Sequence, residues 1–443
     1  MHMMWFTERA YHESDPSKNK ALEDHILGNQ SFFGTPNEMM DRKQASDLLN
    51  MYIDEKVWSE EELDGFDGVM LNEHHGTPFC MGSVMDVEAA ILAKMTKRYK
   101  ISLLGNPITT THNPVRLAEE LAMIDLISGG RLVPGWVRGA GCEQLANGAN
   151  PAHNRELFEE GHDLIMKCWT DDGPFRWEKK FYHFRMVNPW AKPLQEPHPP
   201  IWIPGLVSPD TARWSAQKRY PYVALATYPE PTAELWNIYA EEAAKQGFQA
   251  GSENFGYLQP IFVGETQEQA EEMGRRFLFG GHFAHFARPE WMFPPGYNSK
   301  EATARLARQF ANPNLPGRQM GADWTEETDV DRIRARVYER FEQAQEDGQM
   351  IAGTPDYVIP RIKKVLDILR PGILGFWIDG PIPAQARRTC LRLLSDEVIP
   401  AVREHGKALG LHSPFHKAPG STPINASGIP EPVAFAEAAD GSY

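Results

Sequence analysis

Hydrophobic and polar positions follow two alternating patterns along this chain. Short, continuous apolar runs recur through most of the sequence, and such runs are typical of parallel strands that are buried on both faces. The runs that we interpret as strands are Met3–Phe6, Gly68–Asn72, Ile101–Asn106, Arg131–Val137, Pro200–Gly205, Tyr222–Ala226, Tyr257–Val263 and Gly372–Ile378. Amphipathic stretches separate them, so strands and helices are expected to alternate.

The segment Pro114–Ser128 shows the helical pattern most clearly. Leu117, Leu121 and Ile124 recur at helical spacing, and Gly129 follows where helices commonly end. The other predicted helices are Pro209–Arg219, Ala233–Gly247, Thr266–Phe277 and Pro355–Leu369, and the predicted N-caps are Ser208, Thr266 and Thr354.

This alternation predicts an α/β fold with a parallel sheet. About eight strands favour a closed (β/α)8 TIM barrel with insertions after several strands, although an open, doubly wound sheet would give the same alternation. We assign residues 1–411 to the barrel domain. Residues 412–443 are rich in Pro, Ala and Gly and are predicted to form an irregular C-terminal tail.

Three segments are too long for a simple connection between neighbouring elements. They are Thr7–Gly65, the aromatic, hairpin-like segment 172–199, and the segment 280–348. Long excursions of this kind are commonly lids or binding loops, and an oligomer contact is an equal alternative. We expect lid insertions near 172–199 and 280–348.

Composition excludes several classes of function. The formal net charge of −15 disfavours binding to nucleic acid or to an anionic membrane surface. The four cysteines form no CxxC pair, which is typical of a reduced, cytoplasmic protein. No run of 18 uncharged apolar residues predicts a membrane span, and no GxGxxG motif after a strand predicts a nicotinamide-binding Rossmann unit.

The triplet Glu73-His74-His75 follows a predicted strand. Because side chains alternate along a strand, His74 is expected to face the barrel interior at the carboxyl end, where barrel active sites lie. A histidine there can exchange a proton near neutral pH. A structural histidine and a zinc site are the alternatives, but neighbouring residues on an extended segment point apart, so we expect no metal.

Candidate ligand-binding residues also fall at element ends. Asn106 ends a predicted strand and can both donate and accept hydrogen bonds. Arg138 ends the next strand, and a guanidinium can bind a phosphate through two hydrogen bonds. Ser208 begins a helix whose free amides form a potential anion site. Taken singly, each also fits an ordinary turn, ion pair or helix cap.

Together these residues resemble the bacterial luciferase-like monooxygenases. The resemblance extends from about Met3 to about His405 and implies a flavin-binding barrel. The stretches that carry it, in chain order, are Glu73–His75, Asn113–Glu120, Leu126–Leu132, Arg138–Gly139, Gly353–Asp356 and Glu397–Ala401.

The resemblance also implies roles for individual residues. It places His74, with Glu73 beside it, near the reactive carbon of the flavin. The implied cofactor-binding residues are Gly105, Asn106, Arg138, Gly205, Ser208 and Thr211. Arg138, Ser208 and Thr211 would hold the FMN phosphate. The Gly105–Asn106 strand end would pack against the flavin ring, often through a non-prolyl cis peptide.

The implied activity is that of an FMN-dependent two-component monooxygenase. A separate reductase would supply reduced FMN, which would react with O2 to form a peroxide at the flavin 4a carbon and oxygenate a small organic substrate. A homodimer is expected from the resemblance alone. The alternatives are a hydride-transferring oxidoreductase that uses a deazaflavin coenzyme, a flavin-binding protein without turnover, and a zinc hydrolase.

Overall fold

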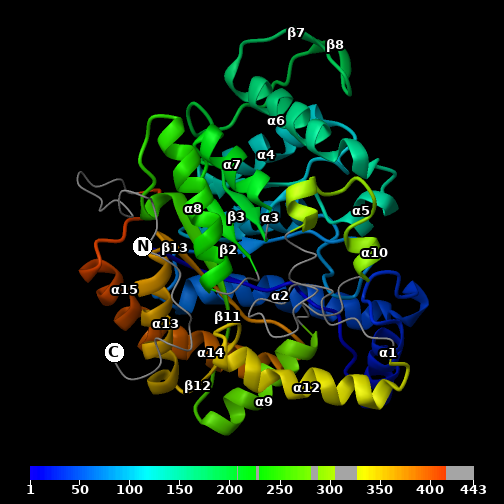
Figure 1. Cartoon of the computed structure of the whole chain (residues 1–443), viewed down its shortest axis with the longest axis vertical. Coiled ribbons are helices and arrows are strands. Elements are labelled where there is room, and N and C mark those ends of the chain that lie inside the picture. The colour runs from blue at the N-terminus through cyan, green and yellow to red at the C-terminus, as the bar shows by residue number, and fades with distance from the viewer. Residues whose placement is uncertain (207, 226–228, 281–287, 305–326, 416–443) are drawn as a thin grey trace.

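The computed structural model describes residues 1–206, 208–225, 229–280, 288–304 and 327–415. Its centre is a curled sheet of parallel strands that is surrounded by helices (Figure 1). Hydrogen-bonded neighbours along this sheet are, in order, β5 (Leu132–Val133), β3 (Lys100–Leu103), β2 (Gly68–Leu71), β1 (His2–Phe6), β13 (Ile373–Trp377), β11 (Phe255–Val263), β10 (Tyr222–Ala224) and β9 (Ile203–Gly205). The predicted α/β fold with a parallel sheet is confirmed.

The two ends of this sheet approach each other. An isolated parallel bridge joins Gly135, which follows β5, to Trp202, which precedes β9. The backbone N–H of Trp202 donates to the carbonyl of Pro134 at 3.0 Å. Beyond the main sheet, β12 (Ile351–Gly353) pairs with β11, and β4 (Asn106–Pro107) pairs with β6 (Trp136–Val137).

Helices cover the outer side of the sheet. Those that connect its successive strands are α1 (Pro16–Asn29), α2 (Arg42–Glu62), α3 (Met85–Met95), α4 (Pro114–Ser128), α5 (Gly141–Ala146), α6 (Asn154–Thr170), α7 (Pro209–Lys218), α8 (Pro229–Lys245), α9 (Gln267–Gly280), α10 (Pro289–Met292), α12 (Val330–Glu346) and α13 (Pro355–Leu369). After β13 come α14 (Ala384–Leu393), the π-helical turn η4 (Leu394–Val398) and α15 (Ile399–Ala408), and short 3-10 turns lie at η1 (Asn37–Met39), η2 (Pro151–His153) and η3 (Ser252–Asn254). None of the described helices is long and apolar enough to cross a membrane.

The three predicted N-cap residues lie at helix starts, and two of them cap through their side chains. Ser208 accepts a hydrogen bond from the amide of Thr211, and Thr266 accepts one from the amide of Gln269. Thr354 occupies the N-cap position of α13 with extended backbone angles, although its side chain forms no cap hydrogen bond. Its backbone carbonyl accepts the amides of Tyr357 and Val358 in the first turn, as an N-cap carbonyl does.

Glycines make room for methionines inside the curled sheet. Gly68 pairs with Met4 on β1, and a Cβ at Gly68 would lie 2.6 Å from the Met4 methyl carbon. A Cβ at Gly375 would lie 3.0 Å from the sulfur of Met70. Flexible methionines fill irregular core spaces well. This packing confirms that Met70 faces the interior, as strand alternation predicts.

The two predicted lid insertions lie in different places relative to the cavity. Segment 172–199 contains the antiparallel hairpin of β7 (Phe175–Glu178) and β8 (His183–Val187), which extends from the top of Figure 1. None of its residues lines the cavity described below. The segment 288–304 does contribute to the cavity wall. Residues 281–287 and 305–326 of the predicted second lid, Ala226 and residues 416–443 lie outside the described residues.

Candidate active site

A cavity of about 200 Å³ lies at the carboxyl ends of the parallel strands. A single water needs only ~10–15 Å³ on the same scale, so the space can hold a much larger group. Its walls are mostly apolar, and they come from strand ends and from the segment 288–304. The residues of these walls include Glu8, Glu73, His74, Leu104, Gly105, Trp136, Arg138, Glu143, Arg155, Gly205, Ser208, Thr211, Phe293, Tyr297 and Trp377.

His74 reaches this cavity from the segment after β2, as strand alternation predicts. Its Nδ1 lies 2.8 Å from Oε1 of Glu143, and its Nε2 lies 3.7 Å from Oε2 of Glu8. Burial by itself lowers the pKa of His74, but the carboxylates of Glu143 and Glu8 outweigh burial and raise the pKa to about 9. The imidazole is therefore cationic at neutral pH.

Glu143 fixes the orientation of this histidine. It lies in the first turn of α5, where its Oε2 accepts the backbone N–H of Ala140 at 3.0 Å. Its Oε1 accepts the backbone N–H of His75 at 3.2 Å as well as the contact with His74. Burial raises the pKa of Glu143, but the cationic His74 outweighs burial and the net pKa is lowered. Glu143 is thus a buried carboxylate with a defined cationic partner.

Glu73 and His75 form a second pair at the edge of the cavity. Oε1 of Glu73 lies 3.1 Å from Nε2 of His75, and its Oε2 accepts the backbone N–H of Met85 at 3.0 Å. Met85 is the first residue of α3, so Glu73 holds the start of that helix. His75 is not among the residues that line the cavity. The two neighbouring histidines therefore point apart, as predicted.

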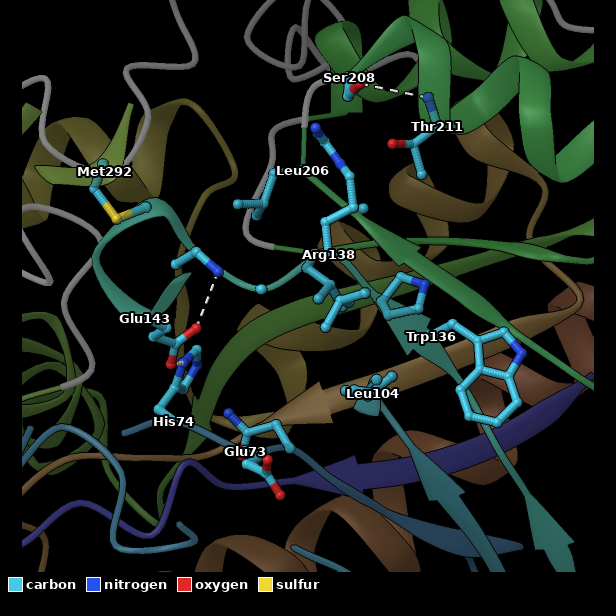
Figure 2. Close-up of a pocket in the computed structure, with 18 of the residues that line it drawn as sticks. Glu73, His74, Leu104, Trp136, Arg138, Glu143, Leu206, Ser208, Thr211 and Met292 are labelled. Atoms are coloured by element: carbon cyan, nitrogen blue, oxygen red, sulfur yellow. Dashed lines mark hydrogen bonds and ion pairs between the residues drawn. The ribbon is translucent and has the colours of Figure 1, made fainter. Parts of the chain in front are cut away.

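Positive charge gathers at the other end of the cavity. Figure 2 shows Ser208 and Thr211 far from His74 and Glu143, with Arg138 between the two groups. Nη1 of Arg138 donates to Oδ1 of Asn154 and to the carbonyl of Tyr297, each at 3.1 Å. Arg138, Ser208 and Thr211 all line the cavity.

Arg155 is a second cation at this end that sequence reasoning missed. Burial lowers its pKa to about 10, and the positive charge of Arg138 contributes to the same shift. It lies on α6, immediately after Asn154, which contacts Arg138. No local motif marks Arg155, because its position depends on how α6 packs across the cavity.

The strand end at Gly105 and Asn106 is split between the cavity and the core. Gly105 lines the cavity with a φ of 125°, a conformation that favours glycine. The Asn106 side chain is turned away and donates to both carboxylate oxygens of Asp86, at 3.1 and 3.2 Å. The cis peptides of the described residues precede Pro174 and Pro197, so the expected cis bond at Gly105–Asn106 is absent there.

Gly205, at the end of β9, also lines the cavity. A Cβ at this position would lie 2.4 Å from the hydroxyl oxygen of Tyr222, so a larger residue would displace that ring. Among the residues that the structure describes, no group of three His, Cys, Asp or Glu side chains is placed to hold a metal ion. The four cysteines are buried and unpaired.

Comparison with known proteins identifies the family. The family model described as luciferase-like monooxygenase matches residues 59–369. This chain belongs to the luciferase-like monooxygenases. It is 30% identical over 348 residues to the oxygenase component of the flavin-dependent trigonelline monooxygenase of Acinetobacter baylyi, covering 77% of this chain and 86% of that protein. The family model and this relative together identify the chain as a flavin-dependent monooxygenase.

A more distant relative is also a monooxygenase, and solved structures share the fold. The alkanal monooxygenase alpha chain of Photobacterium leiognathi is 26% identical over 223 residues, which are 50% of this chain and 61% of that protein. The FMN complex of the oxygenating constituent of 3,6-diketocamphane monooxygenase from Pseudomonas putida has a TM-score of 0.60 at 17% identity, covering 80% of this chain and 94% of that one. An F420-dependent secondary alcohol dehydrogenase has a TM-score of 0.52 at 17% identity, covering 91% and 99%. These structural similarities show the shared fold.

Proposed function

We propose that this chain is the oxygenase component of a two-component, FMN-dependent monooxygenase. It would bind reduced FMN made by a separate reductase and use O2 to oxygenate a small organic substrate. The observation that carries the proposal is the convergence of Arg138 and Arg155 beside the start of α7, at one end of a largely apolar cavity. The other end holds His74 between two carboxylates.

The cationic end fits a phosphate group. The positive charge of Arg138 disfavours the charged form of Arg155, and a bound phosphate dianion would offset that repulsion. Ser208 and the amides at the start of α7 add hydrogen-bond donors in the orientation that helix N-termini offer to anions. We assign the FMN phosphate to Arg138, Arg155, Ser208 and Thr211.

The apolar middle of the cavity fits a flavin ring and a small substrate. Trp136, Leu104 and Trp377 line it, and Phe293 adds an aromatic ring from the segment 288–304. Bound reduced FMN would supply the electrons that activate O2. The contribution of these walls is to exclude water from the reacting groups, while His74 holds a proton at Nε2 beside them. Glu73 would position this segment through α3 and His75.

We further infer that the curled sheet is a closed (β/α)8 barrel with insertions. The parallel bridge between Gly135 and Trp202 supports closure, because it joins the strand after helix α4 to the strand before helix α7. The domain would then comprise residues 1–411. A homodimer remains our expectation, and sedimentation velocity of the purified chain tests it.

The names of relatives support the FMN assignment over the deazaflavin alternative. The trigonelline monooxygenase relative is called an oxygenase component, which is the vocabulary of systems with a separate reductase. The diketocamphane monooxygenase structure contains FMN. Folds of F420-dependent enzymes are also similar, so the coenzyme is the property to test.

The test uses the purified full chain, with and without a generic NADH:FMN reductase. The chain alone is expected to leave NADH unoxidised. With the reductase and FMN, the chain is expected to form an oxygenated product from a suitable substrate, whereas the reductase and FMN alone convert O2 only to hydrogen peroxide. Aldehydes, cyclic ketones, sulfur compounds and aromatic rings form the first substrate panel. Steady NADH oxidation by the chain alone would contradict the two-component proposal. Anaerobic oxidation of reduced deazaflavin, with no reaction of reduced FMN, would favour the hydride-transfer alternative.

A further inference from the structure

Glu8 is a buried carboxylate that faces the same part of the cavity as His74. It follows β1, and the backbone N–H of Glu8 donates to Oδ2 of Asp379, which follows β13. Two neighbouring parallel strands therefore fix its position. The side-chain amide of Asn72 donates to Oε2 of Glu8, and Nε2 of His74 lies 3.7 Å from the same oxygen.

The orientation of Asn72 is itself determined. Nη2 of Arg9 donates to Oδ1 of Asn72 at 3.1 Å, so the amide oxygen faces arginine and the amide nitrogen faces Glu8. Arg9 is in turn paired with Glu88, at 3.2 Å between Nε and Oε2. The contacts around Glu8 thus give it a fixed place without a direct arginine or lysine partner in the described residues.

We propose that Glu8 is a second acid–base residue of this site, which exchanges a proton with the Nε2 side of His74 while Glu143 holds the Nδ1 side. The proposal rests on the proposed function for the identity of the reaction that uses the proton. It assigns a chemical role to a residue that the sequence motifs do not mark. Because Glu8 and Glu143 face opposite nitrogens of the His74 imidazole, each carboxylate has a different task.

The proton balance is simple. In the reactive form of the site, which is present below about pH 7, Glu8 is neutral and His74 is cationic, with Nδ1–H donated to Glu143. A reacting anion takes the proton from Nε2 of His74, which leaves a neutral imidazole. Glu8 then gives its proton to Nε2, which restores the imidazolium and leaves the Glu8 carboxylate. One proton moves in each step, and no oxidant or reductant is required.

The charges that surround the pair agree with this assignment. Burial is the main reason that the pKa of Glu8 is raised to about 7; cationic His74 opposes this rise and the Asp379 carboxylate adds to it. Arg9 also lowers the pKa of both groups, and Glu143 raises that of His74. Glu8 therefore changes protonation near neutral pH, whereas His74 keeps its charge until about pH 9. This revises the expectation that His74 itself titrates near neutral pH.

The test measures the histidine pKa directly in the flavin-free full chain. Imidazole ¹⁵N NMR from pH 5 to pH 10, with the His74→Ala spectrum for assignment, follows His74 and His75 separately. Glu8→Gln keeps the side-chain shape and removes the charge. Because an opposite charge within about 4–6 Å shifts a pKa by roughly 1–3 units, Glu8→Gln is expected to lower the pKa of His74 by that amount.

Glu73→Gln is the matched control. It removes a carboxylate next to His74 in sequence, but that carboxylate contacts His75, so it is expected to lower the pKa of His75 and to leave that of His74 in place. If Glu8→Gln does not fold, Glu8→Asp keeps the charge at a longer distance and is expected to give a smaller shift in the same direction. An unchanged His74 pKa in a folded Glu8→Gln or Glu8→Asp variant would overturn the proposal.

A second measurement separates this inference from the proposed function. With reductase and substrate, product formation by the unaltered chain is expected to fall as pH rises through about 7, as Glu8 loses its proton. Glu8→Gln is expected to lower the rate, and its remaining loss of rate at high pH is expected to follow the lowered pKa of His74 that the NMR titration gives. A Glu8→Gln variant whose rate and pH profile match those of the unaltered chain would overturn the role of Glu8. A chain that shows the NMR shift but no flavin-dependent turnover would disprove the monooxygenase proposal and leave the proton pair intact.

Discussion

Arg138 lies at the cationic end of the cavity, where the second arginine, Arg155, also faces inward. Charge-assisted hydrogen bonds to a phosphate contribute about 1.5–3 kcal/mol. Arg138→Ala is therefore expected to weaken FMN binding by that amount, which is roughly 10–150-fold in Kd. Riboflavin lacks the phosphate, so its affinity is expected to change much less. Anaerobic titration of the reduced flavins measures both affinities.

Arg213→Ala provides the matched control for this prediction. Arg213 lies on α7, close in sequence to the proposed phosphate ligands, but its guanidinium pairs with Glu301 at 2.9 Å and does not line the cavity. Its replacement is expected to leave both flavin affinities unchanged. Equal losses for FMN and riboflavin in Arg138→Ala would show that the arginine contacts some other part of the ligand.

His74→Ala is expected to impair chemistry rather than cofactor binding. General acid–base groups typically contribute about 10²–10⁴-fold, so product formation should fall within that range. Reduced-FMN affinity should change little, because the proposed phosphate ligands lie at the other end of the cavity. Hydrogen peroxide should rise as a fraction of the O2 consumed. Product, peroxide and O2 are measured in the same reaction.

His75→Ala separates this effect from general damage to the segment. His75 contacts Glu73 and does not line the cavity, so its loss is expected to affect stability more than coupling. A His74→Ala variant with normal coupling would contradict the assignment. So would one whose whole defect is a failure to bind flavin.

At this scale, the residues that sequence predicts are those whose position depends on local geometry. The two-residue period of a strand aims His74 at the interior, and a serine before proline predicts the N-cap at Ser208. Glu8, Glu143 and Arg155 reach the site because neighbouring strands or packed helices carry them there. Nothing in their immediate sequence distinguishes them from ordinary polar residues.

Gly105 connects β3 to β4 at the wall of the cavity. Its φ of 125° is unfavourable for other residues, and an alanine Cβ would lie 2.5 Å from Cγ1 of Val137. Backbone strain at such positions costs about 1–3 kcal/mol, and the contact with Val137 adds to it. Gly105→Ala is therefore expected to lower the free energy of unfolding by at least that amount, as measured by urea denaturation.

Gly148 offers a control with the same backbone handedness and no steric contact. Its φ is 73°, and a Cβ there would meet nothing within 4 Å. Gly148→Ala is expected to cost only the backbone preference, roughly 1–2 kcal/mol. If the two variants lose equal stability, the close approach of Gly105 to β6 does not matter energetically.

The elements themselves were predictable where a continuous apolar run or a helical period was long enough. Pro114–Ser128 and Pro355–Leu369 have the predicted bounds. The runs Ile101–Asn106 and Arg131–Val137 each divide into two short strands. Gly105 and Pro134-Gly135 cause the breaks, because a positive φ and a missing proline N–H interrupt the ladder, and the strands pair again as β4 and β6.

Long-range packing determines which of the two predicted lid insertions reaches the cavity. Both aromatic insertions looked suitable as lids, but it is the segment 288–304 that reaches the wall: the hydroxyl of Tyr297 donates to the carbonyl of Gly139 at 2.9 Å. A Cβ at Gly141 would lie 2.5 Å from the carbonyl oxygen of Met292, so this segment packs tightly on α5. Such long-range packing has no local signature in the sequence.

A buried ion pair joins α2 to α14, two helices that are far apart in the sequence. Glu55 on α2 and Arg387 on α14 are 332 residues apart, each side chain is 1% exposed, and Nη2 of Arg387 lies 2.5 Å from Oε2 of Glu55. The guanidinium also lies over the ring of Tyr52, 4.8 Å from its centroid. Because removing one partner leaves the other charge buried and unpaired, Arg387→Met is expected to destabilise the protein by about 3–5 kcal/mol.

The double variant Arg387→Met with Glu55→Leu identifies the cause of that loss. Apolar replacement of both partners of a buried pair is often neutral, so the double variant is expected to regain most of the lost stability. Arg116→Ala breaks an exposed pair with Glu120 and is expected to cost at most about 1 kcal/mol. Urea denaturation of the unaltered protein, of Arg387→Met, of Glu55→Leu and of the double variant gives the coupling energy, with Arg116→Ala as the control. Two results would show that the unpaired buried charge does not cause the loss. One is a loss of stability in Arg387→Met no larger than that in Arg116→Ala. The other is a loss in the double variant at least as large as the sum of the losses in Arg387→Met and Glu55→Leu.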